Sequence, residues 1–291
     1  MPKKTIGFID EYLDNWHAQN YPGLIAKSSL GDQFEVAMAW ELRPAPQSGA
    51  TIDQWCEKHK VAKAKRLAEV VSDCDCIAVL APRDASTHEQ LADLALRSGK
   101  PVYIDKPFAP NVAAAKRLFA KAKRHNTPMY SSSALRFGSA LVKALAGPLA
   151  DKNVKFVATR GSGMFAEYAI HQIEMLVMTL GTGATRVMQQ GNATVQLMLI
   201  DYGDGRRGTI NLAPSHDFSL MAAWGKPGDG GSYRIDQMDD FFPRFIDAML
   251  EFFRTGRVPV PAPQTIEIAA LLQAGCEALE KPDQWLDVPT A

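Results

Sequence analysis

The first 130 residues alternate short apolar runs with stretches of helical pattern, and this alternation limits the possible folds more than any other feature. The apolar runs predict strands at residues 6–9, 34–40, 76–81, 101–104 and 129–132. Helices are expected between them, at about 15–27, from 51, at 86–97 and at 110–124. Ser/Thr-x-x-Glu/Gln spacings begin the helices at Thr51 and Ser86, and Gly99 is placed to end the latter. Strands joined by helices predict right-handed crossovers and a parallel sheet.

After about residue 130 the pattern changes. Helices are expected at 139–145 and 167–180, and strands at 154–159, 185–190, 194–202, 208–212 and 218–224. Gly203-Asp204-Gly205 is a hairpin turn signal, and amphipathic helices at about 238–254 and 264–279 finish the chain. We therefore expect an α/β domain over residues 1–130, followed by an α+β domain over 131–291 with a mostly antiparallel open sheet.

The composition narrows the class of protein. Lys plus Arg and Asp plus Glu are both 32 among 291 residues, so the net charge gives no electrostatic case for nucleic acid or an anionic membrane. Cys74-Asp75-Cys76 lacks the two-residue gap of the usual redox or zinc pairs, which favours plain thiols. No signal peptide or membrane span is predicted, and we expect a cytoplasmic protein without a metal site.

Four stretches together resemble the Gfo/Idh/MocA oxidoreductase family, which includes glucose–fructose oxidoreductase and inositol dehydrogenase. They are CIAVLAPRDASTHEQLADLALRSGKPVYIDKPFA (76–109), SSSALRFGSALVKAL (131–145), EYAIHQIEML (167–176) and TVQLMLIDYGDGRRGTINL (194–212). The resemblance implies a Rossmann domain, an open sheet that serves as the interface of a homodimer or homotetramer, and use of NAD or NADP. It also implies oxidation or reduction of a small molecule, namely a sugar, a polyol or a related hydroxyl or carbonyl compound.

Lys106 resembles the lysine of the family's Glu-Lys-Pro motif, with Asp105 in place of the glutamate. It follows a predicted strand, and ligands of open parallel sheets bind beyond the carboxyl ends of the strands. A lysine there can bind a substrate hydroxyl and stabilise the charge that develops on its oxygen. We interpret Lys106 as a catalytic residue that also contacts the substrate and the cofactor.

His171 lies in EYAIHQIE, which resembles the family pattern Asp-x-Gly-x-His-x-x-Asp with Glu167 and Glu174 in place of aspartates and Ala169 in place of glycine. Glu167 and His171 are four residues apart and share a helix face. The interpretation is a general acid and base, His171, oriented by Glu167. The alternative is a helix-capping or core histidine.

Other residues resemble family positions with weaker signals. Pro82 and His88 resemble a Thr-Pro and a histidine that line the cofactor cleft, although Ala81 replaces the threonine. Arg136, of the Arg-Phe at the domain junction, and Tyr168 are candidate substrate contacts. For Pro82, His88, Arg136 and Tyr168 a purely structural role stays open.

The family's first strand leads into a glycine-rich phosphate loop, which this chain lacks. With Ile9 ending the strand, the three glycine positions hold Asp10, Tyr12 and Asn15. Tyr12 would block the approach of backbone to pyrophosphate, and carboxylates would meet anions at the helix N-terminus. Three interpretations remain: NAD(P) in a shifted pose, a cation or cationic substrate held through Asp10, Glu11, Asp14 and His17, or a domain without a dinucleotide.

The end of the second predicted strand offers the other half of a dinucleotide site. Glu41 is placed to accept from a ribose 2′-hydroxyl, and Arg43 to face a 2′-phosphate or adenine. Glu41 favours NAD and Arg43 favours NADP. The sequence thus predicts an NAD(P)-dependent oxidoreductase. The alternatives are a lyase, isomerase or hydrolase using Lys106 and His171, and a non-catalytic binding protein.

Overall fold

The structure is a computed structural model that describes residues 2–46, 49–192, 194–214, 217–235 and 240–290. The chain forms two compact units. The first unit contains residues 1–109, 114–132 and 243–261, and the second contains 110–113, 133–242 and 262–291. The division into 1–130 and 131–291 expected from the sequence did not anticipate that residues 243–261 group with the first sheet.

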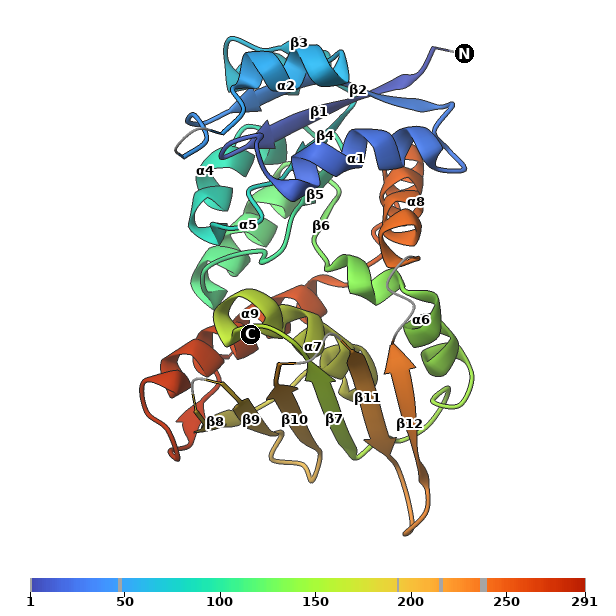
Figure 1. The fold of residues 1–291 in the computed structure, drawn as a ribbon, viewed down its shortest axis with the longest axis vertical. Coiled ribbons are helices and arrows are strands. Elements are labelled where there is room, and N and C mark those ends of the chain that lie inside the picture. Colours follow the sequence, from blue (N-terminus) through green and yellow to red (C-terminus); the bar gives the residue numbers. More distant parts are fainter. Residues whose placement is uncertain (1, 47–48, 193, 215–216, 236–239, 291) are drawn as a thin grey trace. The chain divides into compact units, whose positions relative to one another are not determined.

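The first unit is built on a six-stranded parallel sheet of order β3-β2-β1-β4-β5-β6 (Figure 1). Its strands are β1 (Lys4–Asp10), β2 (Phe34–Glu41), β3 (Ala62–Lys63), β4 (Cys76–Val79), β5 (Val102–Ile104) and β6 (Met129–Tyr130). The parallel α/β architecture is therefore confirmed. The two-residue strand β3 was not predicted, since so short a segment carries no alternation.

The helices of the first sheet are α1 (Trp16–Lys27), α2 (Ile52–His59), α3 (Leu67–Asp73), α4 (His88–Ala92) and α5 (Val112–Arg124). The capping box at Thr51 and Gln54 is present. The helix predicted over 86–97 is wrong in detail: it is broken into η1 (Ala85–Thr87), α4 and η2 (Ala95–Arg97). Asp84, not Ser86, caps its start, because the Asp84 carboxylate accepts from the amide of Ser86.

Helix α8 (Phe241–Thr255) supplies residues 243–255 to the first unit. The Phe245 ring lies 5.8 Å from that of Tyr21 and 5.3 Å from that of Tyr103, and Phe252 packs edge-on against Tyr130. The predicted start of this helix at Met238 lies outside the described residues. These aromatic contacts explain why a late segment belongs to the N-terminal sheet.

The second unit holds a mixed, mostly antiparallel seven-stranded sheet of order β12-β11-β7-β10-β9-β8-β13. Its strands are β7 (Phe156–Gly161), β8 (Arg186–Gly191), β9 (Gln196–Asp201), β10 (Arg207–Leu212), β11 (Phe218–Ala223), β12 (Gly230–Ile235) and β13 (Leu286–Asp287). The pair β7 and β10 is parallel. The sequence predicted the α+β type but missed β12, which begins with two glycines, and the two-residue β13.

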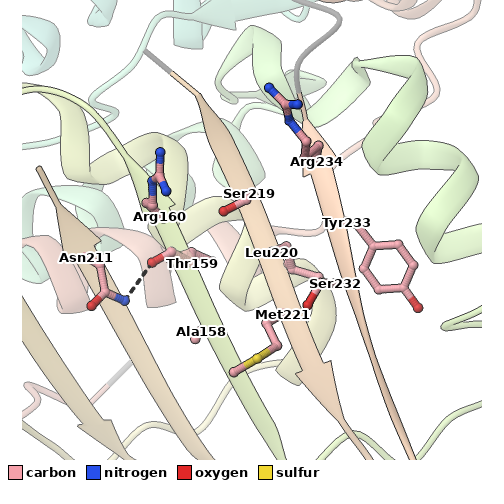
Figure 2. Close-up of a pocket in the computed structure, with 10 residues that line it drawn as sticks. All are labelled: Ala158, Thr159, Arg160, Asn211, Ser219, Leu220, Met221, Ser232, Tyr233 and Arg234. Atoms are coloured by element: carbon pink, nitrogen blue, oxygen red, sulfur yellow. Dashed lines mark hydrogen bonds between the residues drawn. The ribbon is translucent and has the colours of Figure 1, made fainter. Parts of the chain in front are cut away.

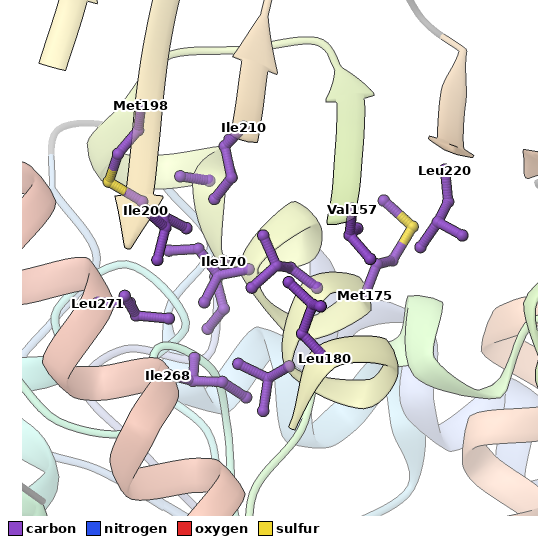
Figure 3. Packing of buried hydrophobic residues seen from close by; sticks show 14 of the residues in the cluster. Val157, Ile170, Met175, Leu180, Met198, Ile200, Ile210, Leu220, Ile268 and Leu271 are labelled. Carbon is purple, nitrogen blue, oxygen red and sulfur yellow. The ribbon is translucent and has the colours of Figure 1, made fainter. Parts of the chain in front are cut away.

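Helices α7 (Phe165–Leu180) and α9 (Ala262–Leu279) pack on one face of this second sheet, and α6 (Ser139–Ala146) contacts β12. Figure 3 shows the resulting core, in which Val157, Met198 and Ile210 of the strands meet Met175 of α7 and Leu271 of α9. All five side chains have no solvent exposure. This core fixes α7, which carries His171.

Candidate functional site

The carboxyl end of β1 in the first unit carries a completely buried acid, Asp10. Its side chain accepts hydrogen bonds from the Asn15 amide at 2.8 Å and from the backbone N–H of Ala81 at 3.0 Å. Burial raises the pKa of Asp10 to about 8, although both hydrogen bonds oppose the shift. Asp10 is therefore mainly protonated at pH 7, so it is not the phosphate-repelling carboxylate that the sequence suggested.

Asn15 occupies the third glycine position and is the N-cap of α1, as the sequence allowed. Its side-chain oxygen accepts from the amide of Ala18 at 3.0 Å, while its amide also donates to the carbonyl of Tyr12 at 2.8 Å. One of the free helix N–H groups that would meet a phosphate is thus bound by the chain itself. Ile9 is buried, and Tyr12 is half-buried.

The end of β2 is bound to the same loop. The Glu41 carboxylate accepts from the amide of Leu13 at 3.1 Å, and burial raises the pKa of Glu41 against that hydrogen bond. The Arg43 guanidinium, which is 58% exposed, forms an ion pair with the buried Glu11 carboxylate. The two residues predicted to recognise the adenosine half of a dinucleotide therefore contact the loop.

An ionic and hydroxyl network lies at the start of α1 and the end of β5. His17 Nδ1 forms an ion pair with the fully buried Asp105 carboxylate, and the Tyr21 hydroxyl lies 3.3 Å from Nδ1. The Tyr103 hydroxyl donates to Asp105 at 2.9 Å, as does the amide of Lys106 at 2.8 Å. Burial pushes the pKa of Asp105 up, but the charge of His17 and its hydrogen bond outweigh burial and lower it.

Lys106 follows Asp105 directly, beyond the carboxyl end of β5, and its side chain is half-buried. Its peptide bond to Pro107 is cis. Among the described residues, the ammonium group forms no hydrogen bond or ion pair, and its charge helps to lower the pKa of Asp105. Lys106 therefore lies past the carboxyl end of β5, the position that the sequence predicted, where a ligand of the sheet would bind.

His88 and Pro82 follow β4. His88 is completely buried, with Nδ1 3.0 Å from the carbonyl of Phe108 and Nε2 2.7 Å from that of Leu80. Both nitrogens contact backbone, so His88 ties the ends of β4 and β5 together. Pro82 is half-buried beside Ala81, whose φ of 50° is a strained value for a residue with a Cβ.

The second unit carries the other predicted residues on α7. Nδ1 of His171 lies 2.6 Å from the hydroxyl of Ser133, and its ring lies edge-on to Phe218 at 5.9 Å. Glu167 is exposed and, among the described residues, its carboxylate forms no ion pair with His171. Ser133 therefore takes the place that the sequence analysis gave to Glu167. The ring of Tyr168, which is 43% exposed, lies 6.1 Å from that of His171.

Arg136 is buried in an ion pair rather than exposed to a ligand. Its Nε donates to Glu174 at 2.7 Å and its Nη2 to Gln264 at 2.9 Å. The other oxygen of Glu174 accepts from the amide of Ser133 at 2.7 Å. Burial raises the pKa of Glu174 against the charge of Arg136. Arg136 and Glu174 thus fix the segment that carries Ser133.

The fit to a dinucleotide is uneven. The sheet order and the position of Lys106 suit one, but the loop between β1 and α1 does not fit a pyrophosphate as a glycine-rich loop does. Asn15 and Glu41 already bind the backbone donors of Ala18 and Leu13, and side chains fill all three glycine positions. In the described part of the chain, no three His, Cys, Asp or Glu residues are grouped to hold a metal, and no helix could cross a membrane.

The sequence matches to known proteins fall mostly within the first unit. Residues 27–132 match the family model described as an oxidoreductase family with an NAD-binding Rossmann fold. The match begins after the loop that carries Asp10, Tyr12 and Asn15. The oxidoreductase YhhX of Escherichia coli K12 is 38% identical over 113 residues, and the oxidoreductase C26H5.09c of Schizosaccharomyces pombe is 32% identical over 107. These matches cover 39% and 37% of this chain but only 31% and 27% of the relatives.

The whole fold is similar to solved dehydrogenases. The scyllo-inositol dehydrogenase of Lactobacillus casei, crystallised with NAD(H) and scyllo-inositol, superposes with a TM-score of 0.80. The alignment covers 99% of this chain and 100% of that one at 16% identity, so it shows the fold alone. The matched residues 27–132 contain β4, β5 and Lys106, so this segment is similar to the NAD-binding Rossmann domain of that oxidoreductase family.

Proposed function

We propose that the protein is an oxidoreductase that uses NAD or NADP on a sugar, a polyol or a related hydroxyl or carbonyl compound. The observation that carries this proposal is Lys106, which follows β5 within the segment that matches an NAD-binding oxidoreductase family. The polyol substrate and the NAD(H) of the similar scyllo-inositol dehydrogenase support the substrate and cofactor classes.

In the proposed reaction Lys106 binds the reacting oxygen of the substrate and stabilises the charge that develops there. His171 binds the substrate as well, and exposed Tyr168 lies next to it on α7. The residues that we propose to surround the cofactor are Ile9, Asp10, Tyr12, Glu41, Arg43, Pro82 and His88. Glu41 and Arg43 must then exchange their contacts with Leu13 and Glu11 for contacts with the adenosine half.

The test is a turnover assay of the purified protein with NAD and NADP against a panel of sugars and polyols. Lys106→Ala should reduce kcat/KM about 10²–10³-fold on any substrate found, because one preorganised group at a developing charge contributes about that much. Lys123→Ala, on α5, is the matched control and should leave turnover unchanged. Full turnover by Lys106→Ala would contradict the assigned role.

A second candidate is favoured by the loop. Asn15, Glu41 and Asp10 form hydrogen bonds with other residues of the first unit. These contacts are consistent with a domain that has lost dinucleotide binding. The protein would then be a lyase, isomerase or hydrolase that uses Lys106 and His171 as acid and base, or a non-catalytic homologue. A protein that binds no cofactor but still catalyses an acid–base reaction would be the non-redox enzyme. If substitution of Lys106 and of His171 changes no activity, the protein would be the non-catalytic homologue.

We further propose that the protein forms a homodimer or homotetramer through the open face of the second sheet, the face opposite α7 and α9. Register places a row of side chains along it: Met188, Leu199, Thr209, Ala158 and Met221. Met221 is 44% exposed. A pocket of about 370 Å³ lies on this face. Figure 2 shows residues that line it, among them Met221, Ala158, Arg160, Ser219 and Arg234.

This row is mostly apolar and only partly buried, and such a surface is typical of a protein–protein contact. Met221→Lys should shift the protein to monomers in analytical ultracentrifugation, while Val258→Lys, which changes a similarly exposed residue of the first unit, should not. An unchanged assembly in Met221→Lys would contradict the assignment.

The four cysteines are free thiols, which supports a cytoplasmic location as part of the proposal.

A further inference from the structure

Ser133 is a completely buried residue whose hydroxyl has two neighbours. It is the N-cap of the short helix η3 (Ala134–Phe137), where its oxygen accepts from the amide of Leu135 at 3.2 Å. The same oxygen lies 2.6 Å from Nδ1 of His171. The amide of Leu135 is a donor only, so it cannot receive the hydroxyl proton.

A buried hydroxyl needs an acceptor for its proton. Within the described part of the chain, His171 Nδ1 is the one acceptor near the Ser133 hydroxyl. The hydroxyl therefore donates to Nδ1, which must present its lone pair. A neutral imidazole has one N–H group, so the proton of His171 sits on Nε2.

The surroundings hold this arrangement in place. The backbone N–H of Ser133 donates to the buried Glu174, which is itself paired with Arg136. The Phe218 ring lies edge-on to the imidazole. Reversing the tautomer would leave the buried Ser133 hydroxyl without an acceptor for its proton, which is unfavourable inside the protein.

We infer that Ser133 is a positioning residue that fixes neutral His171 as the Nε2–H tautomer, so that His171 presents a hydrogen-bond donor rather than a base. A carboxylate on Nδ1, as expected of Glu167, would have fixed the opposite tautomer with a lone pair on Nε2. Resting on the proposed function, this means that neutral His171 polarises a substrate carbonyl oxygen through Nε2–H.

The direct test is ¹⁵N NMR of the histidine rings at a pH where His171 is neutral, a measurement that needs no substrate. The chain has six histidines, and His171→Gln identifies the signals of His171. We expect a bare Nδ1 and a protonated Nε2 in the wild type and in Ser133→Thr, and a mixture of tautomers in Ser133→Ala. Glu167→Gln is the control and should leave the wild-type pattern.

A protonated Nδ1 in the wild type would overturn the inference, as would an unchanged pure Nε2–H form in Ser133→Ala. If Ser133→Ala does not fold, the wild-type spectrum and Ser133→Thr still decide. Where a substrate has been found, Ser133→Ala should lower kcat for carbonyl reduction and change its pH profile, and Ser133→Thr should restore both. Absence of redox turnover would refute the proposed function and leave the tautomer result standing.

Discussion

The side-chain amide of Asn15 donates a hydrogen bond to Asp10 at 2.8 Å, while its oxygen caps α1 through the amide of Ala18. One side chain thus closes the turn that a glycine would leave open. Asn15→Ala should destabilise the protein by about 1–2 kcal/mol from the lost cap, and by more because Asp10 loses a buried partner. Thr51→Ala removes the cap of α2 alone. In urea denaturation, an Asn15→Ala loss no larger than that of Thr51→Ala would contradict this account.

The side chains at the glycine positions should limit dinucleotide affinity. The double variant Tyr12→Gly/Asn15→Gly removes side-chain bulk from two of the three glycine positions. Glycine at the N-cap itself costs only a few tenths of a kcal/mol, and the variant also loses the hydrogen bond from Asn15 to Asp10. We expect tighter binding of NADH or NADPH by calorimetry than in the wild type. Tyr12→Phe, which keeps the bulk, is the control. Equal or weaker binding by the glycine variant would argue against the steric explanation.

Asp10 should make stability fall as pH rises. Its pKa is about 8 in the folded protein against an ordinary 3.8, so the folded state binds more protons between these values. The free energy of unfolding then decreases with pH across that window, by up to about 1.4 kcal/mol per pH unit from this group. Asp10→Asn cannot ionise and should flatten the slope between pH 5 and 8, whereas Asp53→Asn should not. A parallel slope in Asp10→Asn would show that Asp10 titrates normally.

The His17–Asp105 pair should contribute to stability in the opposite direction of pH. Asp105→Ala removes the carboxylate that His17, Tyr103 and the amide of Lys106 contact. It should lower the free energy of unfolding by about 3 kcal/mol or more at pH 7. Because the pKa of Asp105 is lowered, its contribution is present above pH 3.8 and is lost as pH falls through the folded pKa. The deficit of Asp105→Ala should therefore shrink in acid. A deficit that is small at pH 7, or that grows in acid, would contradict the pairing.

Arg136 and Glu174 should behave as a buried pair. Removing either partner leaves an uncompensated charge, so Arg136→Met and Glu174→Gln should each cost about 3–5 kcal/mol. The double variant should cost less than the sum, which a double-mutant cycle measures. The exposed pair of Arg254 and Glu251 is the control and should show much weaker coupling. Additive losses for Arg136 and Glu174 would contradict the assigned ion pair.

The sequence predicted the architecture well because the signals for most helices and strands lie within short stretches of the chain. Alternating apolar runs and caps mark β1, β2, β4 and α2, and period-two patterns mark β7 to β11. Short elements such as β3 and α3 carry too few residues for a pattern. The polar networks were missed for another reason: His17 and Asp105 are 88 residues apart, and Ser133 and His171 are 38 apart. Glu167 was assigned to His171 because helix spacing was the only distance that the sequence offers.

The central claim is that a Rossmann domain without its phosphate-loop glycines still serves a dinucleotide-dependent oxidoreductase. Titration of the purified protein with NADH and NADPH, followed by nicotinamide fluorescence and calorimetric heat, tests it most directly. The account predicts saturable binding of at least one of the two, despite the contacts of Asn15 and Glu41 within the loop. No binding at millimolar concentrations of either cofactor would contradict it and would favour the non-redox alternatives.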